Sequence, residues 1–60
     1  MEKIISILMT RDGVTRDDAI AICNEAKQQM ADCNYDPEEC EDIMQDSLGL
    51  ELDYIFSLLL

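Results

Sequence analysis

Histidine and tryptophan are absent from this 60-residue chain, and the chain has only one proline, one phenylalanine and two glycines. Without histidine it lacks the commonest general base and the commonest metal ligand. No serine or cysteine stands in an activating motif, and no glycine-rich nucleotide-binding motif is present. We therefore expect a protein that is not an enzyme.

A paired set of cysteines is also missing. Cys23, Cys33 and Cys40 form an odd set without a C-x-x-C pair. Free cysteines behave as small apolar side chains and are common in protein interiors. We therefore expect buried thiols in a reducing cytoplasm, with no disulfide, metal or cofactor.

Basic residues are the most informative shortage, because the chain has four of them against fourteen acids, a formal net charge of −10. All four bases lie in residues 1–27, alongside five acids. Residues 28–60 contain nine acids and no base: Asp32, Asp36, Glu38, Glu39, Glu41, Asp42, Asp46, Glu51 and Asp53. Nucleic-acid affinity depends on Lys and Arg neutralising phosphates, so no direct nucleic-acid partner is expected.

Long hydrophobic runs are missing too. The apolar residues between Glu2 and Thr10 are too few for a signal peptide, and the C-terminal run from Asp53 to Leu60 is far too short to span a bilayer. The composition, 48% hydrophobic, is too apolar for intrinsic disorder. We expect a folded cytoplasmic protein without a membrane partner.

The longest periodic stretch, residues 15–33, predicts the helix around which the rest of the chain packs. Thr15, with Asp18 three residues later, is a helix-start signal. The expected buried stripe follows the helical spacing of three and four residues. It consists of Ala19, Ile22, Cys23, Ala26, Met30 and Cys33.

Three further helices are expected. The first covers residues 2–10 and ends at Gly13. The next runs from Pro37 to about residue 47, is capped by Asp36 and ends at Gly49, with Cys40, Ile43, Met44 and Leu48 facing inward. A short last helix begins at Asp53, which could cap it. The predicted fold is one all-α domain over residues 1–60, a small bundle of three main helices plus a short C-terminal one.

The acidic residues do not form a calcium loop. Asp32, Asn34, Asp36 and Glu38 stand at alternate positions as in an EF-hand, but Pro37 occupies the glycine position and Ile43 the final glutamate position. Adjacent carboxylates such as those at 38 and 39 diverge by about 100° on a helix, which favours solvated helix starts over a shared catalytic or metal site.

The apolar chain ends allow two interpretations. They could pack on each other within one small bundle, or form a two-fold interface with a second copy. Large apolar patches usually mark association, and two-fold dimers are the commonest oligomers, which favours a homodimer. The interface residues would be Ile4, Ile5, Leu8, Tyr54, Phe56, Leu58 and Leu59.

The acidic half also allows two interpretations. It could be a solvated face that keeps the protein soluble. Yet mixed charge would serve solubility with less self-repulsion, and Asp42 and Asp46 have no local folding reason to be acidic. The alternative is a binding surface for a basic partner, and its candidate residues are Glu38, Glu39, Glu41, Asp42 and Asp46.

Three segments, Arg11–Ala19, Asp36–Glu39 and Leu48–Ile55, give the chain a resemblance to short acidic phage and prophage proteins of the anti-defence class, which includes anti-CRISPR inhibitors. The resemblance implies a helical protein that binds and blocks a host protein in the host cytoplasm. It assigns no role to any single residue.

We therefore expect a phage-encoded inhibitor whose acidic face docks on a basic, nucleic-acid-handling host defence protein. The alternative is a structural or regulatory adaptor that reaches its partner through the apolar segment from Tyr54 to Leu60.

Overall fold

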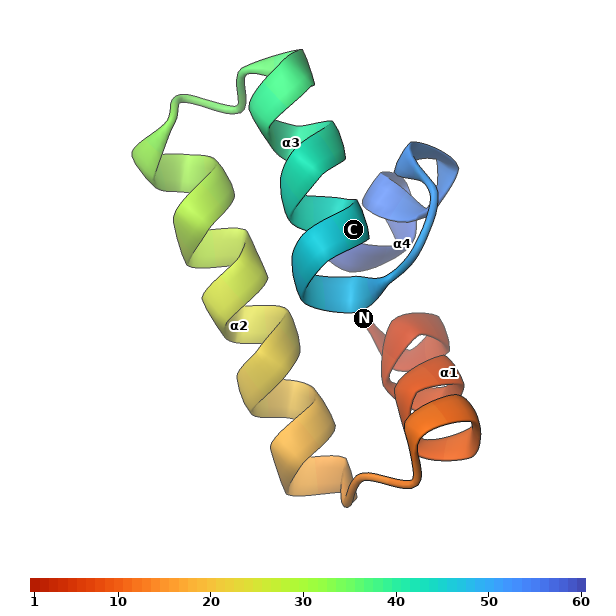
Figure 1. Cartoon of the computed structure of the whole chain (residues 1–60). Helices are drawn as coiled ribbons and strands as arrows, with labels where there is room; N and C mark the ends of the chain where they lie inside the picture. The colour runs from red at the N-terminus through yellow and green to blue at the C-terminus, as the bar shows by residue number, and fades with distance from the viewer.

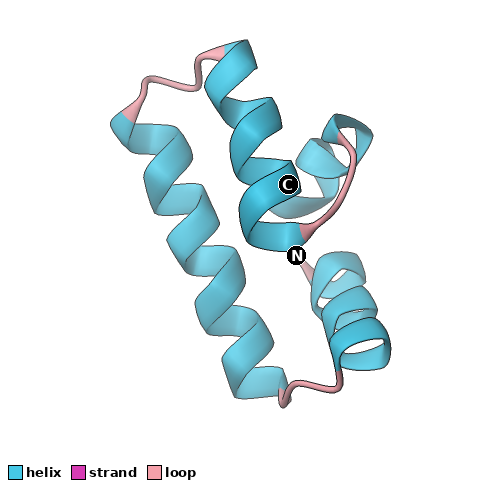
Figure 2. Ribbon diagram, in the orientation of Figure 1, coloured by secondary structure: helices cyan, strands magenta, loops and turns pink.

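The computed structural model describes all 60 residues, and every regular element in it is helical (Figures 1 and 2). The elements are α1 (Glu2–Asp12), α2 (Arg16–Asp32), α3 (Pro37–Ile43), the π-helical turn η1 (Met44–Leu48), the short 3-10 turn η2 (Leu52–Tyr54) and α4 (Ile55–Leu59). This arrangement confirms the predicted all-α small bundle. The molecule measures 29 × 19 × 18 Å, and none of its helices is long and apolar enough to cross a membrane.

Helix α2 is the element on which the others pack. Figure 1 shows α3 and η1 running beside it, and α1, α3, η1 and α4 all contact it. Its fully buried side chains are Ala19, Cys23, Ala26 and Met30, four of the six predicted for its inner stripe. The other two, Ile22 and Cys33, are only partly buried.

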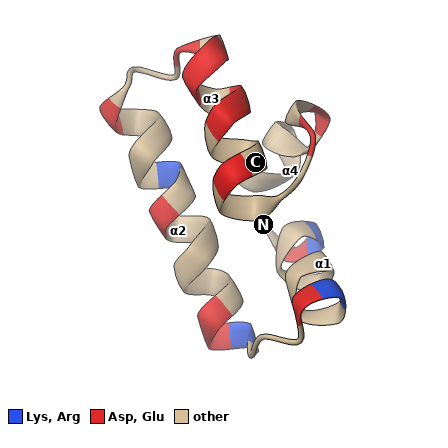
Figure 3. Ribbon diagram, viewed as in Figure 1, with Lys and Arg blue, Asp and Glu red and all other residues tan.

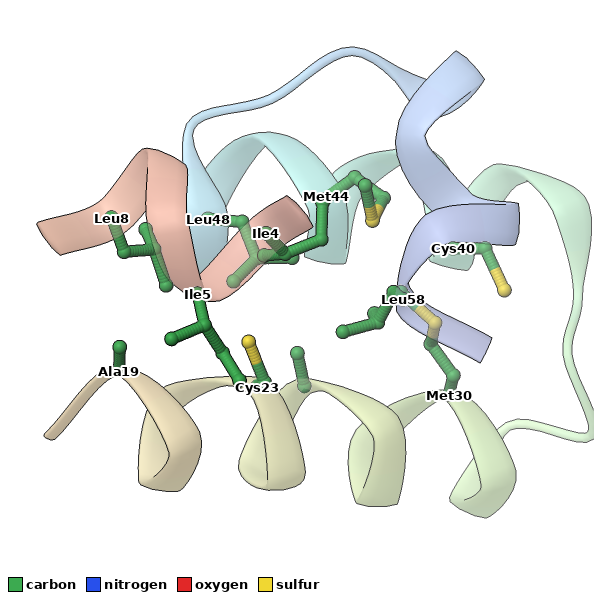
Figure 4. Close-up of a cluster of buried hydrophobic side chains, with 11 residues drawn as sticks. Ile4, Ile5, Leu8, Ala19, Cys23, Met30, Cys40, Met44, Leu48 and Leu58 are labelled. Atoms are coloured by element: carbon green, nitrogen blue, oxygen red, sulfur yellow. The ribbon is translucent and has the colours of Figure 1, made fainter. Parts of the chain in front are cut away.

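The core lies between α2 and the remaining elements (Figure 4). Opposite the α2 side chains it contains residues from α1, α3, η1 and α4. These are Ile4, Ile5, Leu8, Cys40, Met44, Leu48 and Leu58, each no more than 2% exposed. No polar or charged residue is buried. Burial of apolar surface is therefore the main force that holds the bundle together.

This core corrects the predicted dimer interface. Ile4, Ile5, Leu8 and Leu58 were expected on a surface shared with a second copy, but they are buried inside the chain itself. The alternative interpretation holds for these four residues, because α1 and α4 pack on each other within one bundle. The 17-residue α2 is long enough to contact both α1 and α4, so it covers apolar residues of both chain ends at once.

Two helix starts are confirmed as predicted. The Thr15 hydroxyl accepts a hydrogen bond from the Asp18 backbone N–H at 3.2 Å, and the Asp36 carboxylate accepts one from the Glu39 backbone N–H at 3.1 Å. The prediction that Asp53 caps the last helix is wrong. Asp53 lies inside η2, and neither η2 nor α4 has a side-chain cap.

The predicted glycine stops at the ends of α1 and η1 are confirmed. Gly13 and Gly49 have φ angles of 69° and 65°, the left-handed conformation that glycine adopts without a Cβ penalty. Helix α2 instead ends with Asn34 in that conformation, and the Tyr35 N–H donates to the Met30 carbonyl at 2.8 Å. This closure is a Schellman motif, in which asparagine substitutes for glycine.

Arg11 connects the end of α1 to the end of η1. Its guanidinium donates to the Leu48 carbonyl at 2.6 Å and to the Gly49 carbonyl at 3.1 Å, and it also pairs with Asp12. Carbonyls in the last turn of a helix lack partners within that helix. Arg11 therefore stabilises a helix end that lies almost forty residues away in the sequence.

Candidate interaction surface

The predicted acidic face is present on the outer side of α3 and η1. Cys40 and Met44 point inward from these turns, whereas Glu38, Glu39, Glu41, Asp42 and Asp46 are all exposed. Figure 3 shows acidic residues along α3 without a base among them. We call this group of five carboxylates the acidic face.

The acidic face has no partners within the chain. The two salt bridges are Arg11–Asp12 and Arg16–Glu2, and neither involves a residue of this face. None of its five carboxylates accepts a side-chain hydrogen bond. Glu38 and Glu39 lie in the first turn of α3, where the helix dipole favours acids. The like-charge pairs four residues apart, Glu38–Asp42 and Asp42–Asp46, are slightly unfavourable.

The four basic side chains all have partners elsewhere in the chain. Arg16 forms a two-pronged pair with Glu2, at 2.6 and 3.0 Å, and its hydrogen bonds and charge hold the pKa of Glu2 below its ordinary value. Arg11 lowers the pKa of Asp12 in the same way. The Lys3 ammonium lies 5.4 Å from the centre of the Tyr54 ring, and the Lys27 ammonium reaches the Met1 sulfur. The bases therefore leave the acidic face unneutralised.

Beside α3 the surface is hollowed into a groove of about 450 Å³, within the range of ligand-binding pockets. Six of its eight lining residues are hydrophobic. The eight lining residues come from the α2–α3 connection, α3, η2 and α4. They are Tyr35, Pro37, Cys40, Leu52, Asp53, Ile55, Phe56 and Leu59. We call this hollow the apolar groove. Most of its lining was not predicted, because it unites segments from two separate parts of the chain.

Two aromatic side chains of the groove are exposed. Phe56 is 69% and Tyr35 is 53% exposed. Tyr35 also has a φ angle of 57°, a left-handed conformation that is uncommon for a bulky residue. The groove is therefore an apolar surface that the chain leaves uncovered.

The residues of the predicted dimer interface that stay accessible lie at or near this groove. Phe56 and Leu59 line it, whereas Tyr54 lies in a second, polar hollow with Lys3, Glu51, Asp53 and Ser57. The structure thus separates the predicted interface into a buried core group and a group on the surface.

The cysteines occupy two environments. Burial raises the pKa of the Cys23 thiol, and burial together with the nearby Cys33 and Asp36 raises that of Cys40. Cys33 is partly exposed, and its thiol donates to the Met30 carbonyl at 3.3 Å. All three thiols are free. No three His, Cys, Asp or Glu side chains come together as a group that could hold a metal ion.

The fold and surface define a small helical bundle with an uncovered apolar groove beside an unpaired acidic face. No protein-family model, curated protein or solved structure matches the chain.

Proposed function

We propose that this chain is a non-enzymatic binding protein whose acidic face docks on a basic surface of another protein. The partner that best fits the charge is a nucleic-acid-handling protein, whose own ligand is an anion. The resemblance to anti-defence proteins makes the proposal more specific: the chain would be a phage-encoded inhibitor that blocks a host defence protein.

The unpaired acidic face is the observation that carries this proposal. Five exposed carboxylates stand on one side of α3 and η1, and all four bases are engaged elsewhere. Such a field attracts a positive surface, speeds encounter and disfavours acidic partners. Carboxylates at fixed positions on a helix can also occupy the places that phosphates take in a basic groove.

The experiment begins with capture of the partner from host lysate and ends with titrations of the purified complex. Asp42→Lys should weaken binding about tenfold and flatten its salt dependence, because it removes one charge of the interaction and adds the opposite one. Glu25→Lys is the matched control. It makes the same charge change at an exposed mid-helix position of α2, away from the acidic face.

An affinity that responds neither to Asp42→Lys nor to salt would contradict the proposal. Equal effects of Asp42→Lys and Glu25→Lys would show that only net charge matters, which also contradicts a docked acidic face.

The second candidate function is an adaptor that binds an apolar partner through the C-terminal segment, and the exposure of Phe56 and Leu60 favours it. Deleting residues 54–60 cannot test it, because Leu58 belongs to the core. The double substitution Phe56→Ser and Leu60→Ser removes the exposed apolar surface and keeps Leu58. An adaptor should then lose its partner at every salt concentration, whereas Asp42→Lys should leave that partner bound.

A further inference from the structure

We propose that the apolar groove receives the apolar face of a basic amphipathic helix of the partner protein. This inference rests on the proposed function and deepens it, because it states which kind of segment of a basic partner the chain recognises. The acidic face attracts the basic partner electrostatically, and the apolar groove binds the apolar side chains of one of its helices.

The shape and lining of the groove suit the side chains of a helix. Helices bind in apolar grooves through anchors spaced three, four and seven residues apart. Phe56 and Leu59 are three residues apart on α4, and the hollow that they line is also lined by Pro37 and Cys40 of α3. Tyr35 also lines the hollow, and the Schellman closure of α2 fixes its backbone. A bulky apolar anchor would thus meet hydrophobic side chains from both helices.

Charge around the groove selects a basic helix. Asp53 is part of the lining, Asp36 stands between Tyr35 and Pro37 in the sequence, and Glu41 follows Pro37 by one helical turn on the same side of α3. The lining contains no base. Lys or Arg residues flanking the apolar anchors would therefore meet carboxylates at the rim.

The same charges disfavour a second copy of this chain as the occupant. A two-fold contact through the groove places each patch against its own equivalent. Asp36, Glu41 and Asp53 of one copy would then approach the same carboxylates of the other, and residues 28–60 contain no base to separate them. Lys3 lies in the neighbouring polar hollow, against Tyr54. A partner of opposite charge avoids this repulsion.

The test uses three synthetic helical peptides of about 18 residues, long enough for a partly stable helix. The first has Leu and Phe on one face and Lys on the other. The second replaces every Lys with Glu, and the third replaces every Leu and Phe with Gln. Binding to the intact 60-residue chain is followed by amide NMR shifts and by fluorescence anisotropy at low and high salt.

We expect the first peptide alone to bind, with shifts concentrated at Tyr35, Cys40, Phe56 and Leu59. Phe56→Ser should weaken its binding about 30-fold, the typical loss for an anchor aromatic. Asp53→Lys should also weaken it and reduce its salt dependence. Met9→Ser is the matched control, since Met9 is an exposed apolar residue of α1 outside the groove.

Several results would overturn the inference. Equal binding of the Lys and Glu peptides removes the role of charge, and equal binding of the Gln peptide removes the role of the apolar anchors. Shifts confined to the acidic face show contact without the groove. Shifts at groove residues upon concentrating the chain alone identify a second copy as the occupant. No binding at about 1 mM peptide shows that the groove does not recognise such a helix.

The inference and the proposed function can fail separately. If Asp42→Lys weakens the natural partner while Phe56→Ser does not, the groove is not part of the interface and the acidic face remains. If the Lys peptide occupies the groove while Asp42→Lys leaves the natural partner unaffected, the acidic-face proposal fails and the groove remains.

Discussion

Cys23 and Cys40 show how burial changes the chemistry of a single residue. Both are apolar core residues that contribute packing, as expected from the sequence, and both have thiol pKa values above the ordinary 9.0. An apolar environment disfavours a thiolate. The fold therefore keeps these two sulfurs protonated and unreactive.

We predict that folded protein at about pH 8 reacts with a thiol-alkylating reagent first at Cys33, and at Cys23 and Cys40 only after unfolding. Cys33 is the partly exposed member of the three. Mass spectrometry of timed samples, with urea-unfolded protein as the control, measures the order. Labelling of Cys40 as fast as Cys33 would contradict its burial.

The raised thiol pKa values also predict that stability falls in alkaline solution. Above about pH 9 the thiols ionise in the unfolded chain while they stay protonated in the folded one, so the unfolded state holds fewer protons and unfolding becomes easier as pH rises. The loss per thiol is at most about 1.4 kcal/mol for each pH unit. Urea unfolding at pH 8 and pH 10 under reducing conditions measures it. Cys40→Ala should reduce this loss of stability between pH 8 and pH 10 more than Cys33→Ala does.

Helix boundaries show what local sequence determines. The starts at Thr15 and Asp36 and the stops at Gly13 and Gly49 were all predicted, because each depends on residues within one or two turns of the boundary. The prediction failed at Asp53 because a capping residue must directly precede its helix. The 3-10 turn η2 begins at Leu52, one residue before Asp53.

Features that join distant segments were not predictable from the sequence. Arg11 lies in the last turn of α1, yet its guanidinium donates to the carbonyls of Leu48 and Gly49 at the distant end of η1. The apolar groove likewise needs the connection at Tyr35 to lie beside α4. No spacing rule relates such segments. The acidic face was predictable because its members are close neighbours on one helical run.

The two glycine stops allow a matched test of the Arg11 contact. An alanine Cβ at Gly13 meets nothing within 4 Å, whereas one at Gly49 lies 3.2 Å from an Arg11 nitrogen. We predict that Gly13→Ala costs about 1–2 kcal/mol from backbone strain alone, and that Gly49→Ala costs more because it also displaces Arg11.

A double-mutant cycle separates the two contributions. In an Arg11→Ala background the penalties of Gly49→Ala and Gly13→Ala, measured by urea unfolding, should become equal. A persistent difference would show that Arg11 is not what distinguishes the two sites.

The whole molecule carries a net charge of −10 on only 60 residues, and the acidic face has no compensating base. Self-repulsion of this kind opposes the compact state. Neither salt bridge of the chain involves the acidic face, so no internal ion pair offsets this repulsion.

We predict that raising NaCl from about 20 to 500 mM stabilises the protein, because salt screens repulsion between exposed charges. Asp42→Asn and Asp46→Asn together should raise stability by a few tenths of a kcal/mol per like-charge pair removed and should weaken the salt response. Glu2→Gln is the control, because Glu2 is paired with Arg16 and its loss should bring no such gain. Thermal unfolding across the salt series measures both effects, and destabilisation by salt would contradict the prediction.

The placement of all four bases on α1 and α2, with only acids on α3 and the turn before α4, makes the molecule an electric dipole as well as an anion (Figure 3). A dipole feels a torque in a non-uniform field, in addition to a pull. Near a positive body the bundle would rotate before touching, so that α3 leads and α1 trails. The molecule would then be oriented during its approach, and most collisions would occur with α3 facing the positive body.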